Sequence, residues 1–555
     1  MFQFIMTLTT VTIVHAQAPT SPDLAGNWKL VGTLPANPAG QDSVLLLLKA
    51  GEKQDDWNVI TNGIAPFKGA SVKAGVPSQS VLELNFSGPI PLRCVFKIPG
   101  EKAQKIVGAF NLRGNWFPCS IERNPKDSLE KETLEKPTPG SELVGKLSKA
   151  SNLAEKLAIV GEINQKYPSS PAGLVACRML LEEMVKGREG ALIRDAIKEL
   201  EKACAGYPPQ LTNGLHGGVA LAMANKKWNS ELAETLLEKI KKDSQNSSES
   251  GMKRLVLKLE SKIYPQVGKN ELANKAAQEL ESIDKALDQE FEKNAVPFAT
   301  QPKTLSGFSK NSPAVVELFT GAQCPPCVAA EVAFDALSKS YTSGDLILLQ
   351  YHLHIPGPDP MTNAHSELRA RYYGVNSTPT MFLNGRQGPP SGGSKAGGQK
   401  AFESVVSSIG NSTRDPGHQK IVMEMTASKQ GDDHAVSINF KGFEAHRAHI
   451  LRVALVEDSV RYPGRNGQRI HHHVVRAFLG DPKGIAPDGA QGSQSVKFNI
   501  AAVRKEILEY LEKSHARRPF LDDERPLDLA KLSVVAWFQN IDTKEIVQVS
   551  RISLD

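Results

Sequence analysis

The chain lacks a large excess of charge of either sign. Its 66 Lys and Arg are nearly balanced by 60 Asp and Glu, and the net charge is +6. The basic residues have acidic neighbours along the sequence and form no stripe, so we expect no nucleic-acid partner. A hydrophobic content of 40% and a charged content of 23% are ordinary for soluble globular proteins and exclude wholesale disorder.

Long apolar runs are also lacking. Beyond the N-terminus no stretch reaches the roughly 18 apolar residues that a membrane-spanning helix needs, so no transmembrane anchor is expected. Residues 1–18 have an apolar middle and end in Ala16-Gln17-Ala18, the small-residue pattern that signal peptidase cleaves. No cysteine directly follows to carry a lipid anchor. We therefore predict a signal peptide and export to the periplasm or secretion, with a buried first strand as the alternative.

Four segments with different residue patterns follow, as expected for 555 residues at roughly 100 to 200 residues per domain. Short alternating runs predict a small β-barrel or sandwich at 24–128. Apolar residues at helical spacing predict an α-helical domain with repeat-like features at 141–295, which is either a protein-binding scaffold or a plain spacer. Alternating strands and helices predict an α/β domain at 312–411, and strands return as a predicted β-sandwich at 418–555. The fold class expected is multidomain α+β.

The Cys-Pro-Pro-Cys motif at residues 324–327 is the strongest chemical signal. It lies where a predicted strand passes into a predicted helix. The free N–H groups and partial positive charge of a helix N-terminus stabilise a thiolate, so we expect Cys324 to be the nucleophile. Cys327, one helical turn further on, is expected to be more buried and to resolve a mixed disulfide. Two cysteines at this spacing also fit half of a zinc site, so the surrounding sequence has to decide.

Residues 374–385, Gly-Val-Asn-Ser-Thr-Pro-Thr-Met-Phe-Leu-Asn-Gly, resemble the cis-proline loop and following strand of the thioredoxin superfamily. Residues 315–386 are similar to a family of uncharacterised secreted bacterial thioredoxin-like proteins. The resemblance implies a thioredoxin-like fold for 312–411. It also implies a cis peptide between Thr378 and Pro379, lying against the dithiol, with the backbone of Thr378 available to pair with an incoming substrate chain.

The C-terminal part carries a second resemblance. The segments 454–458 and 472–476, Ala-Leu-Val-Glu-Asp and His-His-Val-Val-Arg, look like the domain that follows the thioredoxin unit in an outer-membrane-associated family. That family implies a β-domain after the thioredoxin-like one.

The motif departs from that of thioredoxins proper, which carry Trp-Cys-Gly-Pro-Cys and a buried Asp on the preceding strand. Here Gln323 precedes the first cysteine and two prolines separate the pair, so the substrate range and the redox potential stay open. Glu317 lies on the predicted strand seven positions before Cys324. We expect it either to shuttle a proton to Cys327 or to be an exposed residue at the edge of the sheet.

Histidines at positions 352, 354, 365 and 471–473 raise the question of a metal site. Alternate positions on a strand share a face in any sequence, and consecutive histidines point in different directions, so we predict no metal and no cofactor. The alternative is copper held by Cys324, Cys327 and one of His352 or His354.

Four further cysteines form an even set in an expected oxidising compartment. Pairing within each domain would join Cys94 to Cys119 and Cys177 to Cys204. The alternative is four buried free thiols, which pack as small apolar residues.

The sequence therefore predicts an exported thiol-disulfide oxidoreductase. Its partners would be exported client proteins with thiols or disulfides and an unidentified redox partner, and the direction of electron flow stays open. The alternative is a binding or copper-handling protein in an extracytoplasmic complex, in which Cys324 and Cys327 form a static bridge or hold the metal.

Overall fold

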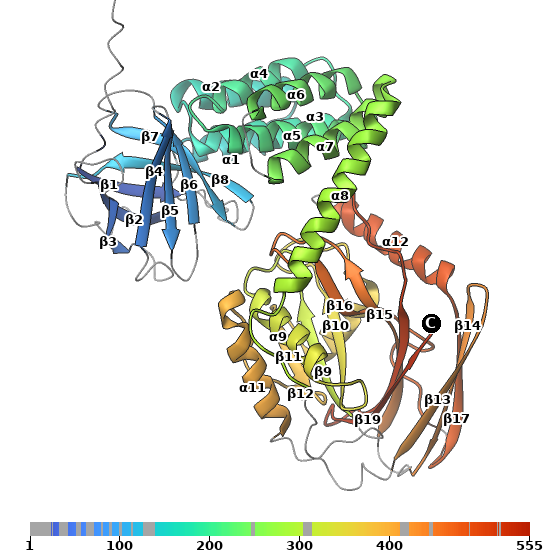
Figure 1. Cartoon of the computed structure of the whole chain (residues 1–555). Coiled ribbons are helices and arrows are strands. Elements are labelled where there is room, and N and C mark those ends of the chain that lie inside the picture. The colour runs from blue at the N-terminus through green and yellow to red at the C-terminus, as the bar shows by residue number, and fades with distance from the viewer. Residues whose placement is uncertain are drawn as a thin grey trace, which may run out of the picture. The chain divides into compact units, whose positions relative to one another are not determined.

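The chain forms two compact units, Met1–Ala273 and Asn274–Asp555, in the computed structural model (Figure 1). The predicted signal peptide lies outside the described residues. The structure describes residues 24, 26–32, 43–50, 57–62, 71–78, 81–87, 92–98, 103–112, 115–125, 139–245, 250–302, 313–410, 421–442, 448–487, 489–518, 520 and 523–554.

The first unit begins with a single antiparallel sheet that curves into a half-barrel (Figure 1). Alternation along its strands puts Leu82, Leu84 and Phe86 on the inner face, with Trp28 and Phe96. The structure thus has one curved sheet here, where the sequence left open a barrel or a two-sheet sandwich. Its strands, in the order β3-β2-β1-β8-β7-β6-β5-β4, are β1 (Gly26–Gly32), β2 (Ser43–Ala50), β3 (Trp57–Asn62), β4 (Ser71–Ser78), β5 (Val81–Ser87), β6 (Leu92–Lys97), β7 (Lys105–Leu112) and β8 (Asn115–Arg123).

Helices complete the first unit. Asn152 and Ser170 cap two of them by accepting a backbone N–H with their side chains. Ala109, on the sheet, belongs to the same hydrophobic core as the helices, and Val107 packs against it, so the predicted β and helical domains form one unit. The helices are α1 (Ser141–Leu147), α2 (Leu153–Lys166), α3 (Pro171–Gly187), α4 (Ile193–Ala203), α5 (Pro209–Asn225), α6 (Ser230–Ser244), α7 (Ser250–Ile263) and the 3-10 turn η3 (Tyr264–Val267), before α8 (Asn270–Asn294) continues into the second unit.

The four remaining cysteines are buried free thiols, so the predicted pairings are not present. Cys94 and Cys119 are hydrogen-bonded to each other. Burial is the main cause that raises the pKa of Cys119, and the contact with Cys94 raises it further. Their strands are both paired to β7, which puts the backbones roughly 9 Å apart. A disulfide needs Cα atoms within about 7 Å.

The second unit is built on an eight-stranded mixed sheet of order β12-β11-β9-β10-β16-β15-β18-β19. β9 and β10 are parallel, β11 is antiparallel to β9, and β10 joins β16 at Gln350 and Val474. The elements up to residue 410 are β9 (Ala314–Thr320), α9 (Cys327–Ser340), β10 (Leu346–His352), α10 (Ala364–Tyr373), β11 (Thr380–Leu383), β12 (Arg386–Gln387), η4 (Lys395–Gly397) and α11 (Gly398–Gly410).

The predicted boundary between 312–411 and 418–555 runs through this sheet. Four of the later strands continue it, and Val456 and Trp537 share a core with Phe319 on β9. These strands are β15 (His449–Arg461), β16 (Ile470–Phe478), β18 (Leu532–Asn540) and β19 (Ile546–Ser553).

A second, three-stranded sheet shares another core with β15, β18 and α12 (Ile500–Arg517). It contains β13 (Val422–Gln430), β14 (Asp433–Lys441) and β17 (Gly492–Asn499), in the order β13-β14-β17. Two sheets therefore pack together in this part of the chain, and one of them also carries β9 to β12. None of the helices among the described residues is long and apolar enough to cross a membrane.

Both faces of β9 are covered, and all its residues are buried. Val316 and Leu318 face a core with α9 and α11, whereas Val315 and Phe319 face a core with α10 and the later strands. Figure 1 shows α9 and α11 on the same side of β9 to β12. This alternation decides which side chains of β9 can reach the cysteine motif at the start of α9.

Candidate functional site

The two cysteines of the Cys-Pro-Pro-Cys motif are joined in a disulfide, with Cα atoms 5.4 Å apart. Cys324 lies in the turn after β9, where its N–H donates to the Gly321 carbonyl at 2.9 Å, and α9 begins at Cys327. The predicted position between strand and helix is confirmed. Cys324 is 1% exposed and Cys327 0%, so the two differ less in burial than expected. Pro325 and Pro326, between them, are exposed.

Thr378 and Pro379 lie against the disulfide. The peptide between them is cis, as expected, and the Cys324 Sγ is 3.6 Å from the Thr378 carbonyl oxygen. The Thr378 hydroxyl donates to the Ile355 carbonyl at 3.3 Å, and Ile355 begins a second cis peptide that the sequence analysis did not anticipate.

A glycine-rich loop, residues 388–398, covers the beginning of α9. The N–H of Gly393 donates to the Pro326 carbonyl at 2.7 Å, and its carbonyl accepts from the Ala329 N–H at 3.1 Å. A Cβ at Gly392 would stand 3.6 Å from the Pro379 ring. This loop therefore contacts both the start of the helix and the cis-proline segment.

Glu317 is not placed to serve Cys327, which corrects the sequence prediction. It lies on the α10 face of β9, opposite α9, and is neither exposed nor at an edge of the sheet. Its carboxylate accepts from Arg369 at 2.8 and 2.9 Å and from the Tyr373 hydroxyl at 2.6 Å. Arg369 is itself 1% exposed, so Glu317 is the counter-ion of a buried guanidinium.

Glu331 is a buried acid on the cysteine side of the sheet, and the sequence analysis missed it. It stands on α9 four positions after Cys327 and is 4% exposed. Its carboxyl accepts hydrogen bonds from the Thr320 hydroxyl and, at 3.4 Å, from the Asn466 amide. Burial, with the nearby carboxylates of Asp335 and Asp359, raises the pKa of Glu331 to about 8. Two acids one turn apart in the otherwise apolar stretch 328–337 were the signal available in the sequence.

Asp359 fixes the turn before Cys324. Its carboxylate accepts from the Ala322 N–H at 2.6 Å, the Met361 N–H at 2.8 Å and the His352 ring at 2.8 Å. Burial opposes the charged form, but His352 and the two N–H groups keep the pKa of Asp359 below its usual range. The side chain is therefore a charged anchor for the turn.

The histidines contact different neighbours, and two of them contact each other. The His352 and His471 rings lie 4.9 Å apart, edge to face, and burial lowers the pKa of His471 to about 3. His354 accepts from the Asp359 N–H at 3.0 Å, and the His473 ring lies 3.1 Å from the Ser338 hydroxyl. Within the described ranges, no group of three or more His, Cys, Asp or Glu side chains is arranged to hold a metal ion.

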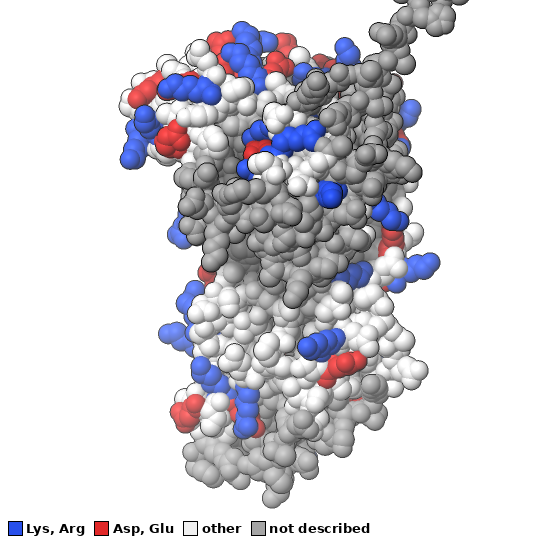
Figure 2. All heavy atoms as spheres, turned by 90° about the vertical axis from the view of Figure 1, so that its left-hand side faces the viewer, with Lys and Arg blue, Asp and Glu red and all other residues white. Residues whose placement is uncertain are grey.

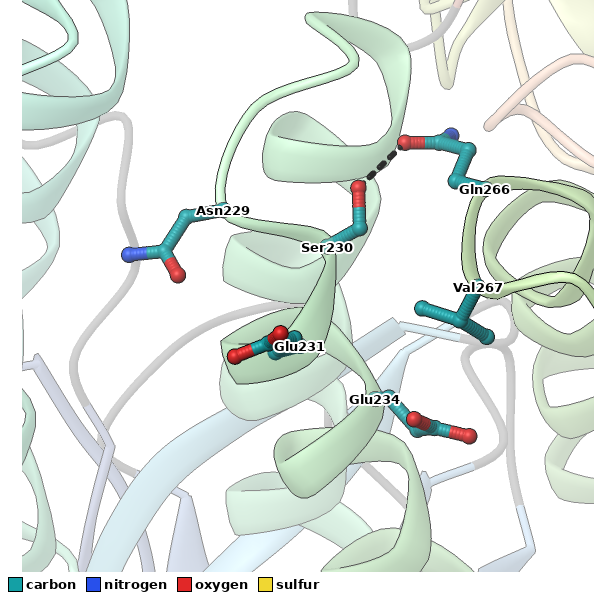
Figure 3. A pocket seen from close by; sticks show the side chains of 6 residues that line it. All are labelled: Asn229, Ser230, Glu231, Glu234, Gln266 and Val267. Atoms are coloured by element: carbon teal, nitrogen blue, oxygen red, sulfur yellow. Dashed lines mark hydrogen bonds between the residues drawn. The ribbon is translucent and has the colours of Figure 1, made fainter.

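A hollow in the first unit is lined by residues from the start of α6 and from η3 (Figure 3). The Ser230 hydroxyl donates to the Gln266 side chain at 2.7 Å, and Lys269 pairs with Glu234 at 2.6 Å. The residues that line this hollow include no cysteine or histidine, and the dithiol belongs to the other unit. The lining residues are Asn229, Ser230, Glu231, Glu234, Gln266 and Val267.

On the face shown in Figure 2, the Lys and Arg side chains of the described residues are interspersed with Asp and Glu. The coloured side chains in this view form no large patch of one sign.

Comparisons with known proteins found little. No protein-family model matches the chain, and none of the curated proteins matches it. Among solved structures, the chain is similar to HBP35 of Porphyromonas gingivalis, with a TM-score of 0.30 and 17% identity over 46% of this chain and 77% of that one. At this score the likeness does not establish a common fold.

Proposed function

We propose that this chain is a thioredoxin-like thiol-disulfide oxidoreductase that exchanges disulfides with proteins through Cys324 and Cys327. The observation that carries the proposal is the disulfide at the start of α9, with the Cys324 Sγ 3.6 Å from the carbonyl of Thr378 in the cis Thr378–Pro379 segment. The order β9-α9-β10-α10-β11-β12-α11 and the sheet arrangement β12-β11-β9-β10 support the thioredoxin-like assignment.

The chemistry follows from the two sulfurs. A client thiolate attacks the Cys324 Sγ, the bond to Cys327 breaks, and a mixed disulfide joins the client to Cys324. A second client thiol then displaces Cys324, so the client loses two electrons and the Cys324–Cys327 pair gains them. The reverse sequence reduces a client disulfide, and Cys327 then clears the mixed disulfide. The exposed Pro325 and Pro326 border the side from which a client approaches.

The cellular setting is part of the same proposal and rests on the sequence of residues 1–18. The enzyme acts after export, its clients are exported proteins with thiols or disulfides, and another redox protein restores the starting state of the dithiol. The first unit holds clients or tethers the enzyme to a complex.

Trapping variants test the proposal. Cys327→Ser should accumulate disulfide-linked adducts with client proteins, seen as bands on non-reducing gels that dithiothreitol removes, because the resolving thiol is missing. Cys324→Ser should form few adducts. Cys177→Ser is the control for random oxidation, since Cys177 is a buried free thiol in the first unit.

A static bridge or copper site makes no mixed disulfide in its work and predicts no difference between the two variants. Equal or absent trapping, together with no insulin reduction in the presence of dithiothreitol and no oxidation of a reduced peptide, would refute the oxidoreductase proposal.

A further inference from the structure

A buried acid lies one helical turn behind the inner sulfur. Glu331 follows Cys327 by four residues on α9, and residues at this spacing share a face of a helix, with Cβ atoms about 6 Å apart. The carboxyl is 4% exposed and accepts from the hydroxyl of Thr320, the last residue of β9. The acid thus occupies the covered space between the start of α9 and the end of β9.

The second partner of Glu331 comes from the later part of the unit. Asn466 belongs to the loop between β15 and β16, and its amide lies 3.4 Å both from Glu331 and from the Gly321 carbonyl. Its backbone N–H donates to the Ala322 carbonyl at 3.1 Å. This loop therefore contacts the turn that carries Cys324 and the acid behind Cys327 together.

The loop between β15 and β16 packs closely against the turn that carries Cys324. The N–H of Gly464 donates to the Gln468 carbonyl at 2.7 Å, which closes the loop on itself. A Cβ at Gly464 would stand 2.6 Å from the Ala322 carbonyl oxygen, so a larger residue would push the loop away from the turn. Asn466 and Gln468 are each 4% exposed.

In the part of the chain that the structure describes, the carboxyl of Glu331 has no cationic partner to hold it ionised. Among the described residues it forms no ion pair, and its charged neighbours, Asp335 and Asp359, are acids. The Asp335 carboxylate interacts electrostatically with His472 and Lys339, and the Asp359 carboxylate is hydrogen-bonded to His352. Burial and these acids raise the pKa of Glu331 to about 8, so near pH 7 the group carries a proton.

We propose that Glu331 donates its proton to the Cys327 Sγ when a thiolate opens the Cys324–Cys327 disulfide, and that Asn466 is the positioning residue for that acid. This inference rests on the proposed function. The attacking thiolate forms a bond with the Cys324 Sγ, the bond between the two cysteine sulfurs breaks, and its electron pair goes to Cys327. The proton of Glu331 converts that thiolate into a thiol and leaves a Glu331 carboxylate; in the reverse step the carboxylate takes the proton back.

The test is the pH profile of disulfide opening in the full chain. The oxidised protein is mixed with 2-mercaptoethanol between pH 6 and pH 10, quenched with acid, alkylated and weighed, and each rate is divided by the thiolate concentration of the reagent. In the wild type the normalised rate should fall as pH rises through about 8, where Glu331 loses its proton. Glu331→Gln should show no such fall and be about 100-fold slower near pH 7, within the usual range for general acids.

Stability separates proton transfer from damage to the fold. An acid whose pKa is raised by folding takes up a proton as the chain folds, so the free energy of unfolding decreases as pH rises from 4.5 toward 8. Glu331→Gln removes this penalty. It should therefore unfold at an equal or higher urea concentration at pH 8 than the wild type while opening its disulfide more slowly.

Two further variants complete the design. The fall in the normalised rate of disulfide opening is a break in the pH profile. Asn466→Ala should move this break to higher pH, because the Asn466 hydrogen bond lowers the pKa of Glu331. Asp335→Asn, a change of a neighbouring buried acid on the same helix, should keep the break, moved to lower pH. A wild-type profile without a break, or a break that survives in Glu331→Gln, would overturn the inference and leave the proposed function standing. Failure of the wild-type disulfide to open with any thiol would overturn the proposed function itself.

Discussion

At the scale of single residues, the structure separates two buried acids that could have served the dithiol. Glu317 forms an ion pair with Arg369 on the far face of β9, whereas Glu331 lies behind Cys327 with hydrogen-bond donors but, among the described residues, no cationic partner. An ion pair keeps an acid charged, and burial without a cation keeps it neutral. Burial therefore leaves Glu331 with a proton to give near pH 7.

Glu317→Gln should destabilise the protein by about 3 to 5 kcal/mol, because it leaves the Arg369 charge buried without its counter-ion. Urea unfolding followed by circular dichroism measures this. The control is Glu281→Gln, which removes an exposed pair with Lys285 and should leave the midpoint of urea unfolding nearly unchanged, because exposed ion pairs contribute little to stability.

The Glu317→Gln protein that stays folded should keep the wild-type pH profile of disulfide opening. A lost break in that profile would mean that Glu317, rather than Glu331, serves the dithiol.

At the scale of elements, the packing of α11 on α9 holds the covering loop. Gly398 begins α11 at the end of the glycine-rich loop, and a Cβ there would stand 2.4 Å from a methyl group of Val332 on α9. The two helices therefore approach closely at a point that only glycine permits. The same loop holds Pro326 and Ala329 through the backbone of Gly393.

Gly398→Ala should force α11 away from α9 and destabilise the protein by about 1 to 3 kcal/mol, the usual range for overpacking. The midpoint of urea unfolding reports the loss. Gly410→Ala at the other end of α11 is the matched control, since a Cβ there meets nothing within 4 Å. Equal midpoints for the two variants would show that α11 shifts at no cost.

At the scale of the whole molecule, the second unit cannot be divided where the sequence pattern changes. Phe319 and Tyr351 share their core with Val456, Val475 and Trp537 from the later strands. The loop that carries Asn466 also comes from that later part. The core and the surroundings of the cysteine motif therefore both draw on the earlier and the later parts of the unit.

A fragment of residues 312–411 should consequently fold poorly, because it exposes the apolar face of β9 and β10 that the later strands bury. A fragment of residues 274–555, the complete second unit, should unfold cooperatively. Amide NMR dispersion and dye binding to exposed apolar surface compare the two. A well-dispersed spectrum from the shorter fragment would restore the predicted domain boundary.

Local features of this protein were determined by the sequence alone. Periodicity and turn residues placed the main strands and helices and the Cys-Pro-Pro-Cys motif between strand and helix, and the resemblance of residues 374–385 to the thioredoxin superfamily implied the cis peptide before Pro379. These depend on neighbouring residues, whose spacing the sequence displays directly.

Long-range pairings were decided only by the tertiary structure. Whether Glu317 lies on the same side as the cysteine motif depends on which helix covers its face of β9. Asn466 contacts Glu331 although the two residues are 135 positions apart in the chain. Strands β15, β16, β18 and β19 joined the earlier sheet, because the α10 face of β9 and β10 needed an apolar cover. Strand alternation shows that a residue is buried, but the partner that buries it is chosen by the packing of the whole unit.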